Sequence, residues 1–141
     1  MREILFKAKR IDNGKWAEGC LVIDHSRSSL FEYRMRPVES GALYAPPINP
    51  ETICQFTGLC DKNGNKIWEN DIVLITENVY STVKFDLYHE AGKSERTHQG
   101  FYLESMDKYY YREELGYWAK ESVVVGNIFD NKELLQEGSD E

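Results

Sequence analysis

Cysteine is scarce in this sequence, and its spacing fits neither a disulfide framework nor a zinc ribbon. The three cysteines, Cys20, Cys54 and Cys60, are odd in number and form no C-x-x-C pair. Secreted disulfide scaffolds and zinc ribbons both depend on paired cysteines at short spacings. We therefore expect a cytoplasmic, reducing environment, with three buried or half-buried thiols.

Long apolar runs are missing as well. The chain has no uninterrupted apolar stretch of about 18 residues, the length that a membrane-spanning helix needs. The N-terminus also lacks the charged segment followed by a continuous apolar stretch that marks a signal peptide. The sequence therefore predicts no membrane partner.

Positive charge is in deficit. Residues 1–50 carry 8 Lys and Arg against 6 Asp and Glu, whereas residues 51–141 carry 9 against 18. Such a balance repels phosphate backbones unless a local basic patch overrides it. The nearest equivalent of a basic patch in the sequence is the group Arg27, Arg34 and Arg36. Nucleic acid is therefore disfavoured and remains the alternative partner.

Catalytic and metal-binding motifs are also lacking. The three histidines, His25, His89 and His98, fall in polar stretches that predict loops, and no HExxH, P-loop, GxGxxG or GxSxG motif occurs. The adjacent acids Glu113 and Glu114 would point to opposite faces of a strand. We therefore predict no catalytic residue, no metal and no cofactor, and a small-molecule enzyme is the least favoured hypothesis.

What the sequence does contain is strong turn chemistry, concentrated in residues 51–76. A β-prone run ends at Thr57-Gly58, where glycine offers the positive φ of a tight turn. Asn63-Gly64 then lies between apolar residues, which is the strongest short-range signal for a hairpin. We predict a turn at the first pair and a hairpin tip at the second.

A further turn at residues 69–71 precedes the β-branched run of residues 72–75. This run has the length of a strand and is apolar throughout, which predicts a buried central strand. Asp71 opens the strand, and we expect its carboxylate to accept hydrogen bonds from backbone N–H groups of its own turn.

These residues carry a family resemblance. The segments QFTGL, DKNG and ENDIV, together with MREI at the start and VGNIF and ELL near the end, are similar to the pattern of the YopX family of phage and prophage proteins. The resemblance covers essentially the whole chain and implies a phage or prophage origin, but no activity and no catalytic residues. Asn70 stands where the family pattern usually has glycine. Asparagine tolerates left-handed geometry, so we expect the turn to persist.

The chain before this stretch predicts a β unit and a connecting loop. Asp12-Asn13-Gly14 between residues 4–11 and 16–23 indicates a hairpin, and residues 30–35 alternate as a strand. Residues 37–50 contain all four prolines and predict an extended, semi-rigid loop.

The chain after it predicts further strands. Residues 80–88 alternate, with Val83, Phe85 and Leu87 on one face, and residues 100–103 resume the sheet. The polar residues 89–99 predict a mobile loop. Residues 122–125 predict a last strand, followed by a short helix that Asp130 would cap.

The most aromatic segment is residues 106–118. One hypothesis is a binding surface, either for bases, which stack on aromatic rings, or for a partner's side chains. The other is that the rings seal one end of the sheet, which we favour because nearby acids would repel a phosphate backbone. The candidate binding residues are Tyr109, Tyr110, Tyr111, Tyr117 and Trp118.

Together these patterns predict a mainly β fold: an antiparallel SH3-like or partly open small barrel with an N-terminal β extension and a short C-terminal helix. We expect one domain over residues 1–136, with an N-terminal part at 1–50 and a core at 51–136, and a frayed tail at 137–141. The preferred function is non-catalytic binding of a host or phage protein, through the aromatic segment or Pro46-Pro47. Edge strands also suggest self-association.

Overall fold

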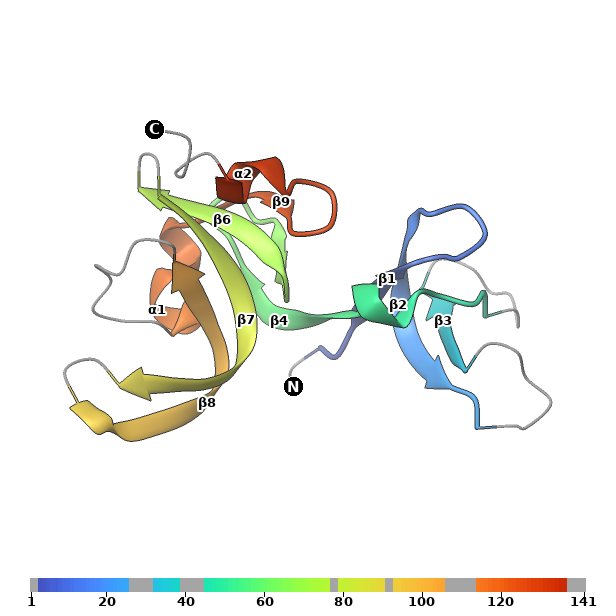
Figure 1. The fold of residues 1–141 in the computed structure, drawn as a ribbon, viewed down its shortest axis with the longest axis horizontal. Helices are drawn as coiled ribbons and strands as arrows, with labels where there is room; N and C mark the ends of the chain where they lie inside the picture. Colours follow the sequence, from blue (N-terminus) through green and yellow to red (C-terminus); the bar gives the residue numbers. More distant parts are fainter. Residues whose placement is uncertain are drawn as a thin grey trace. The chain divides into compact units, whose positions relative to one another are not determined.

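The chain divides into two units, Met1–Phe56 and Thr57–Glu141. A computed structural model describes residues 3–25, 32–38, 45–76, 79–90, 93–105 and 114–136 (Figure 1). The predicted tail at 137–141 lies outside the described residues. Unit 1 holds β1 (Phe6–Lys9), β2 (Trp16–Ile23), β3 (Tyr33–Pro37), η1 (Pro50–Thr52) and the start of β4 (Cys54–Cys60). Unit 2 holds the rest of β4, then β5 (Lys66–Trp68), β6 (Asp71–Thr76), β7 (Val79–Glu90), β8 (Lys93–Ser105), α1 (Leu115–Trp118), η2 (Ala119–Glu121), β9 (Val123–Asn127) and α2 (Glu133–Gln136).

The first hairpin forms as its turn residues predict. Gly14 takes a φ of 70°, and its N–H donates to the carbonyl of Arg10 at 3.0 Å. The turn sets the antiparallel register of β1 and β2, which places Lys9 opposite Trp16. β3 then pairs with the other edge of β2, and the start of β4 pairs with β1.

The sheet of unit 1 has one apolar face. Side chains that alternate along its strands bury a small core, which consists of Ala8, Ala17, Met35 and Ile48. Gly19 lies in β2 where a Cβ would meet the carbonyl oxygen of Arg36 at 1.9 Å. Only glycine permits this close approach of β2 and β3.

The proline-rich segment is described at residues 37–38 and 45–50, and the second of these parts lies against the sheet. The N–H of Met35 donates to the carbonyl of Pro46, and the N–H of Ile48 donates to that of Tyr33. Pro46 is buried and Pro47 is half-buried. This packing leaves Pro46-Pro47 a poor candidate for an exposed peptide ligand.

Unit 2 is built on β6. The four-stranded sheet has the order β8-β7-β6-β9, so β6 is an interior strand with partners on both sides. Ile72 and Val73 are fully buried. The prediction of a buried central strand is confirmed.

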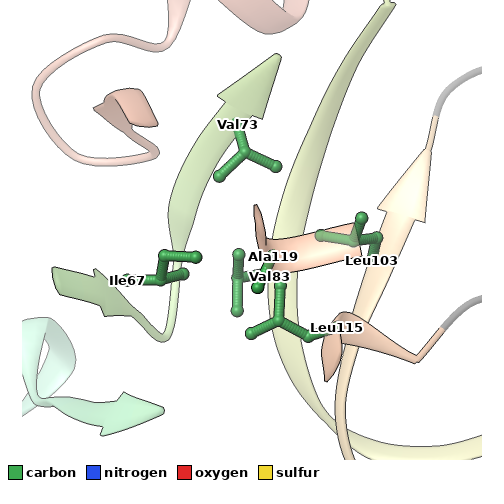
Figure 2. Packing of buried hydrophobic residues seen from close by; sticks show 6 residues of the cluster. All are labelled: Ile67, Val73, Val83, Leu103, Leu115 and Ala119. Carbon is green, nitrogen blue, oxygen red and sulfur yellow. The ribbon is translucent and has the colours of Figure 1, made fainter. Parts of the chain in front are cut away.

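Side chains from six elements meet in the core of unit 2 (Figure 2). α1, which packs against β8, contributes Leu115 to this core, and η2 contributes Ala119. The cluster consists of Ile67, Val73, Val83, Leu103, Leu115 and Ala119, with Leu59, Ile75, Phe101, Trp118 and Val124 packed against it.

Two predictions about loops and turns are wrong. The described residues 89–90 and 93–99 form strand rather than loop, because β7 and β8 make one long hairpin in which Tyr88 pairs with His98 and His89 with Thr97 (Figure 1). Polar composition does not prevent a strand whose faces are solvated. The segment Thr57-Gly58 is not a turn either: Gly58 has a φ of 86°, but β4 runs through it.

The C-terminal helix is confirmed, although it begins later than the predicted cap implies. α2 starts at Glu133, and the preceding turn is organised by Asn127, whose Oδ1 accepts from the N–H groups of Phe129 and Asp130 at 2.9 Å. β9 also extends through Gly126 and Asn127, where the sequence predicted a stop.

The fold class is confirmed as mainly antiparallel β. Within the described ranges the two sheets are not closed into a barrel. Closure would require the outer strands to pair, whereas β8 and β9 occupy opposite edges of their sheet. Among the described helices, none has the length and apolar character that crossing a membrane requires.

The thiols are distributed differently from the prediction. Cys54 is buried, and its Sγ donates to the carbonyl of Thr52 at 3.3 Å. Cys20 and Cys60 are exposed. The alternation of a strand explains the difference for Cys20, because its neighbour Gly19 takes the buried face of β2.

Candidate functional site

Asp61 follows β4 and holds three backbone N–H groups at once. Its Oδ1 accepts from the N–H groups of Asn63 and Asn65, each at 2.9 Å. Its Oδ2 accepts from the N–H of Val124 in β9, also at 2.9 Å. The residue is 5% exposed. The carboxylate therefore fixes the hairpin tip and ties it to the last strand of unit 2.

The predicted hairpin at Asn63-Gly64 forms around this carboxylate. Gly64 has a φ of 84°, and its N–H donates to the carbonyl of Asp61 at 3.0 Å. Burial by itself would raise the pKa of Asp61, but the N–H groups of Val124, Asn65 and Asn63 stabilise the charged form. The pKa of Asp61 is therefore held below its ordinary value of 3.8.

The second turn behaves as its sequence predicts. Asn70 has a φ of 72°, so asparagine does occupy the left-handed position. Asp71 is 2% exposed, and its Oδ2 accepts from the N–H of Trp68 at 2.8 Å. Both acids of this region thus bind backbone groups, which is a structural role.

The described residues contain no group of three or more His, Cys, Asp or Glu side chains that could hold a metal ion. Of the histidines, His25 is highly exposed and lies 3.7 Å from Glu32. His98 is also exposed, and the side chain of His89 lies outside the described residues.

The paired turns at Asp61 and Asn70 lie at the centre of a pattern that extends along the chain. The family model described as "YopX protein" matches residues 5–136, nearly the whole chain. The chain belongs to the YopX family. Membership confirms the resemblance that the turn segments carry, and it assigns no activity.

A solved structure resembles this YopX-family chain. The crystal structure of protein EF1440 from Enterococcus faecalis is 22% identical, with a TM-score of 0.48, and the match covers 96% of this chain and 99% of that one. A search of curated proteins gave no match.

The predicted aromatic site is only partly described. Tyr109, Tyr110 and Tyr111 lie outside the described residues. Tyr117 is 51% exposed on α1, whereas Trp118 is half-buried and packs against the core. The two rings contact each other edge to face, with centroids 4.8 Å apart. The two described members thus divide between surface and core.

A second apolar surface lies on the hairpin of β7 and β8. Val83, Phe85 and Leu87 share one face, as predicted, but only Val83 is buried. Phe85 is 45% exposed and Leu87 is 62% exposed. Phe85 meets Phe101 of β8 edge to face, with centroids 4.9 Å apart. We call Phe85, Leu87 and Phe101 the hairpin surface.

The opposite face of the same hairpin carries a row of rings. Tyr88 lies between His98 and Tyr102, with ring centroids 5.6 Å and 5.8 Å away. Its ring covers Gly100, where an added Cβ would lie 3.7 Å from the tyrosine. A ring above a strand glycine protects the backbone there and stiffens the hairpin.

Sequence reasoning missed two features of this region. It placed Val83, Phe85 and Leu87 on one face without indicating that only Val83 of the three is buried. It also treated Asp61 as part of a turn rather than as the link to β9. The length of the alternating pattern in β7 is a signal for the exposed end of the hairpin, because the short helix α1 covers only part of so long a strand. The hydrogen bond between Asp61 and Val124 has no such signal, because the two residues are far apart in the sequence.

Proposed function

We propose that this YopX-family protein is a non-catalytic module of phage or prophage origin that binds a protein of the host or the phage in the bacterial cytoplasm. The hairpin surface would be its contact, with Tyr117 as a second anchor. The observation that carries the proposal is the exposure of Phe85 and Leu87 on the sheet face that also contributes Val83 and Leu103 to the core. Apolar side chains gathered on a surface typically mark a site of protein contact.

The position of the hairpin surface supports this proposal. Phe101 packs against the core cluster of unit 2, as Trp118 does, so the surface continues a rigid core rather than a loop. The ring pair of Phe85 and Phe101 presents a large apolar area that loses little side-chain freedom on binding. A partner with apolar side chains would bury these rings.

Self-association through edge strands has less support. The outer edge of β3 is bridged by Pro47, and that of β8 by Glu114. On β9, the N–H groups of Val124 and Asn127 are taken by the side chains of Asp61 and Asn131. These contacts reduce the backbone available for pairing with another chain.

The test is a quantitative affinity experiment with a matched control. The bait proteins would be wild type, a Phe85→Ser/Leu87→Ser variant, a Tyr117→Ala variant, and an Ile11→Ser control that removes a comparably exposed apolar residue from unit 1. Each is incubated with nuclease-treated host lysate, and any enriched protein is purified and titrated against each bait.

We expect one protein that binds wild type and the Ile11→Ser control equally and binds the Phe85→Ser/Leu87→Ser variant at least about tenfold more weakly. The Tyr117→Ala variant should lose less. Equal binding by the double variant would refute the hairpin surface as the contact. Sedimentation of the purified protein separates self-association from binding of a different chain.

A further inference from the structure

The sheet of unit 1 has a second face, opposite its core, whose residues come from three strands and are not adjacent in the sequence. Residues that pair across antiparallel strands lie on the same side of the sheet. Lys7 pairs with Glu18 and Lys9 with Trp16, while Arg36 pairs with Cys20 and Arg34 with Val22. Since alternate residues of β2 share a side, all these side chains lie opposite the buried core.

This face concentrates positive charge. Four of its strand residues are cations and one is an acid, Glu18, while Asp24 directly follows β2 and Glu32 directly precedes β3. We call the set of four cations and one aromatic side chain the basic face; it consists of Lys7, Lys9, Trp16, Arg34 and Arg36. A chain with a net charge of −7 thus presents a local cluster of the opposite sign.

The side chains of the basic face are brought together by direct contacts. The Nζ atoms of Lys7 and Lys9 lie 4.6 Å and 5.4 Å from the ring centroid of Trp16. Cation–π attraction holds both ammonium groups beside the same indole. Arg34 is fixed by donation from Nη1 to the carbonyl of Ala45 at 3.0 Å, and Arg36 is exposed.

The shape of the basic face favours one class of polyanion. It is an open sheet surface about 10 Å wide, since neighbouring strands lie about 4.8 Å apart. A duplex is usually read by a helix or a β-ribbon that enters a groove. A single strand needs only cations along its backbone and a flat ring on which a base stacks. Lys7 and Lys9, which lie beside the indole ring of Trp16, supply that combination.

We propose that the basic face of unit 1 binds single-stranded nucleic acid, with Lys7, Lys9 and Arg36 contacting phosphates and Trp16 stacking on a base. This goes beyond the proposed protein contact, which lies entirely in unit 2. Local charge rather than net charge decides such binding, because phosphate contacts act over about a Debye length, roughly 10 Å at 0.1 M salt.

The test uses fluorescein-labelled oligothymidylate and oligouridylate of about 12 nucleotides, within the range that small sheet modules bind. Anisotropy is measured against salt concentration for wild type, Lys7→Gln/Lys9→Gln, Trp16→Ala, and the control Lys62→Gln/Lys66→Gln. The control removes the same charge from exposed lysines of unit 2. Thermal unfolding of each variant checks that its fold is retained.

We expect wild type and control to bind alike. The Lys7→Gln/Lys9→Gln variant should bind at least about tenfold more weakly at low salt, and its plot of log K against log salt should be shallower by about 1.4. Trp16→Ala should weaken binding about fivefold or more with little change in that slope. If Trp16→Ala fails to fold, the lysine variant still tests the proposal.

Three outcomes would overturn it. The first is no binding at low salt. The second is equal loss in the Lys62→Gln/Lys66→Gln control, which would mean that only net charge matters. The third is equal affinity for duplex DNA or heparin with no dependence on Trp16. The Phe85→Ser/Leu87→Ser variant should bind oligonucleotide normally, so failure of this proposal is distinguishable from failure of the protein contact.

Discussion

The two units bury apolar groups in different ways. Unit 1 has a small core in which two of the four buried members are alanines, and it depends on a close approach of backbones at Gly19. Unit 2 has a core of branched side chains covered by α1 and η2, and Asp61 ties its first hairpin to its last strand. Unit 1 therefore packs by bringing backbones close together, whereas unit 2 packs by filling the space above its sheet with larger side chains.

The two units also differ in charge. Residues 1–56 carry 8 Lys and Arg against 7 Asp and Glu, whereas residues 57–141 carry 9 against 17. Unit 1 gathers its cations on one sheet face, and unit 2 exposes apolar rings on the hairpin surface. The units are therefore suited to different partners, which the variants proposed above separate.

The largest expected effect is in the core of unit 2. Leu115→Ala removes a fully buried side chain and should lower the free energy of unfolding by about 2–5 kcal/mol. Chemical denaturation followed by tryptophan fluorescence measures the loss. Tyr117→Ala in the same helix is the control, because Tyr117 is half exposed, and it should cost much less. Equal losses would contradict the assignment of Leu115 to the core.

Asp61 should come next, because its loss leaves three backbone N–H groups without an acceptor. We expect Asp61→Ala to destabilise the protein by about 2–4 kcal/mol in chemical denaturation. Asp12→Ala removes an exposed carboxylate that pairs with Arg10 at 2.6 Å, and it should have a far smaller effect. A small effect of Asp61→Ala would mean that the hairpin tip is held by other contacts.

The same carboxylate predicts a pH dependence. The pKa of Asp61 is lowered in the folded protein, so its stabilisation is complete above the unfolded value of 3.8. It is lost as the pH falls below 3.8 and through the folded pKa. Asp61→Asn should therefore show a flatter fall in stability in that acidic range than wild type. Parallel curves would rule out Asp61 as a source of the dependence.

Gly19 tests the role of backbone proximity in unit 1. Gly19→Ala places a Cβ 1.9 Å from the carbonyl oxygen of Arg36, so β2 and β3 must separate, at a cost of about 1–3 kcal/mol. Gly14→Ala meets no atom within 4 Å and strains only the left-handed turn, at about 1 kcal/mol. Thermal unfolding measures the loss of stability in both variants. A larger loss for Gly14→Ala would mean that the turn, and not the close approach of β2 and β3, limits the stability of unit 1.

The smallest effect should be at Asn70, which takes a left-handed φ of 72°. Asn70→Gly relieves the strain of the left-handed conformation but removes the Oδ1 atom that accepts a hydrogen bond from Lys84 Nζ at 3.1 Å. The net change in the free energy of unfolding should therefore stay within about 1 kcal/mol. Asn70→Ala loses the same contact without the relief, and it should be the less stable of the two. Because both variants lose the side-chain contact, the opposite order in thermal unfolding would show that the left-handed conformation does not penalise alanine at this position.

The sequence by itself determined the elements whose signals are local. Asn13-Gly14 and Asn63-Gly64 specify hairpins because their turns need positive φ, and the β-branched run at 72–75 specifies a strand because it fits only a buried, pleated surface. The left-handed turn at Asn70 and the backbone role of Asp71 also follow from neighbouring residues alone.

Only the tertiary structure decided what depends on distant parts of the chain. Asp61 reaches Val124, the hairpin of β7 and β8 extends through polar residues, and Lys7 meets Trp16 through strand register. Local propensity cannot indicate that the ring of Phe85 is exposed. The residues that bury the rest of its sheet face, 115–119, lie about 30 positions later in the sequence. Pairing between strands brings together charges and rings that the linear sequence keeps apart, and both proposed binding surfaces arise in that way.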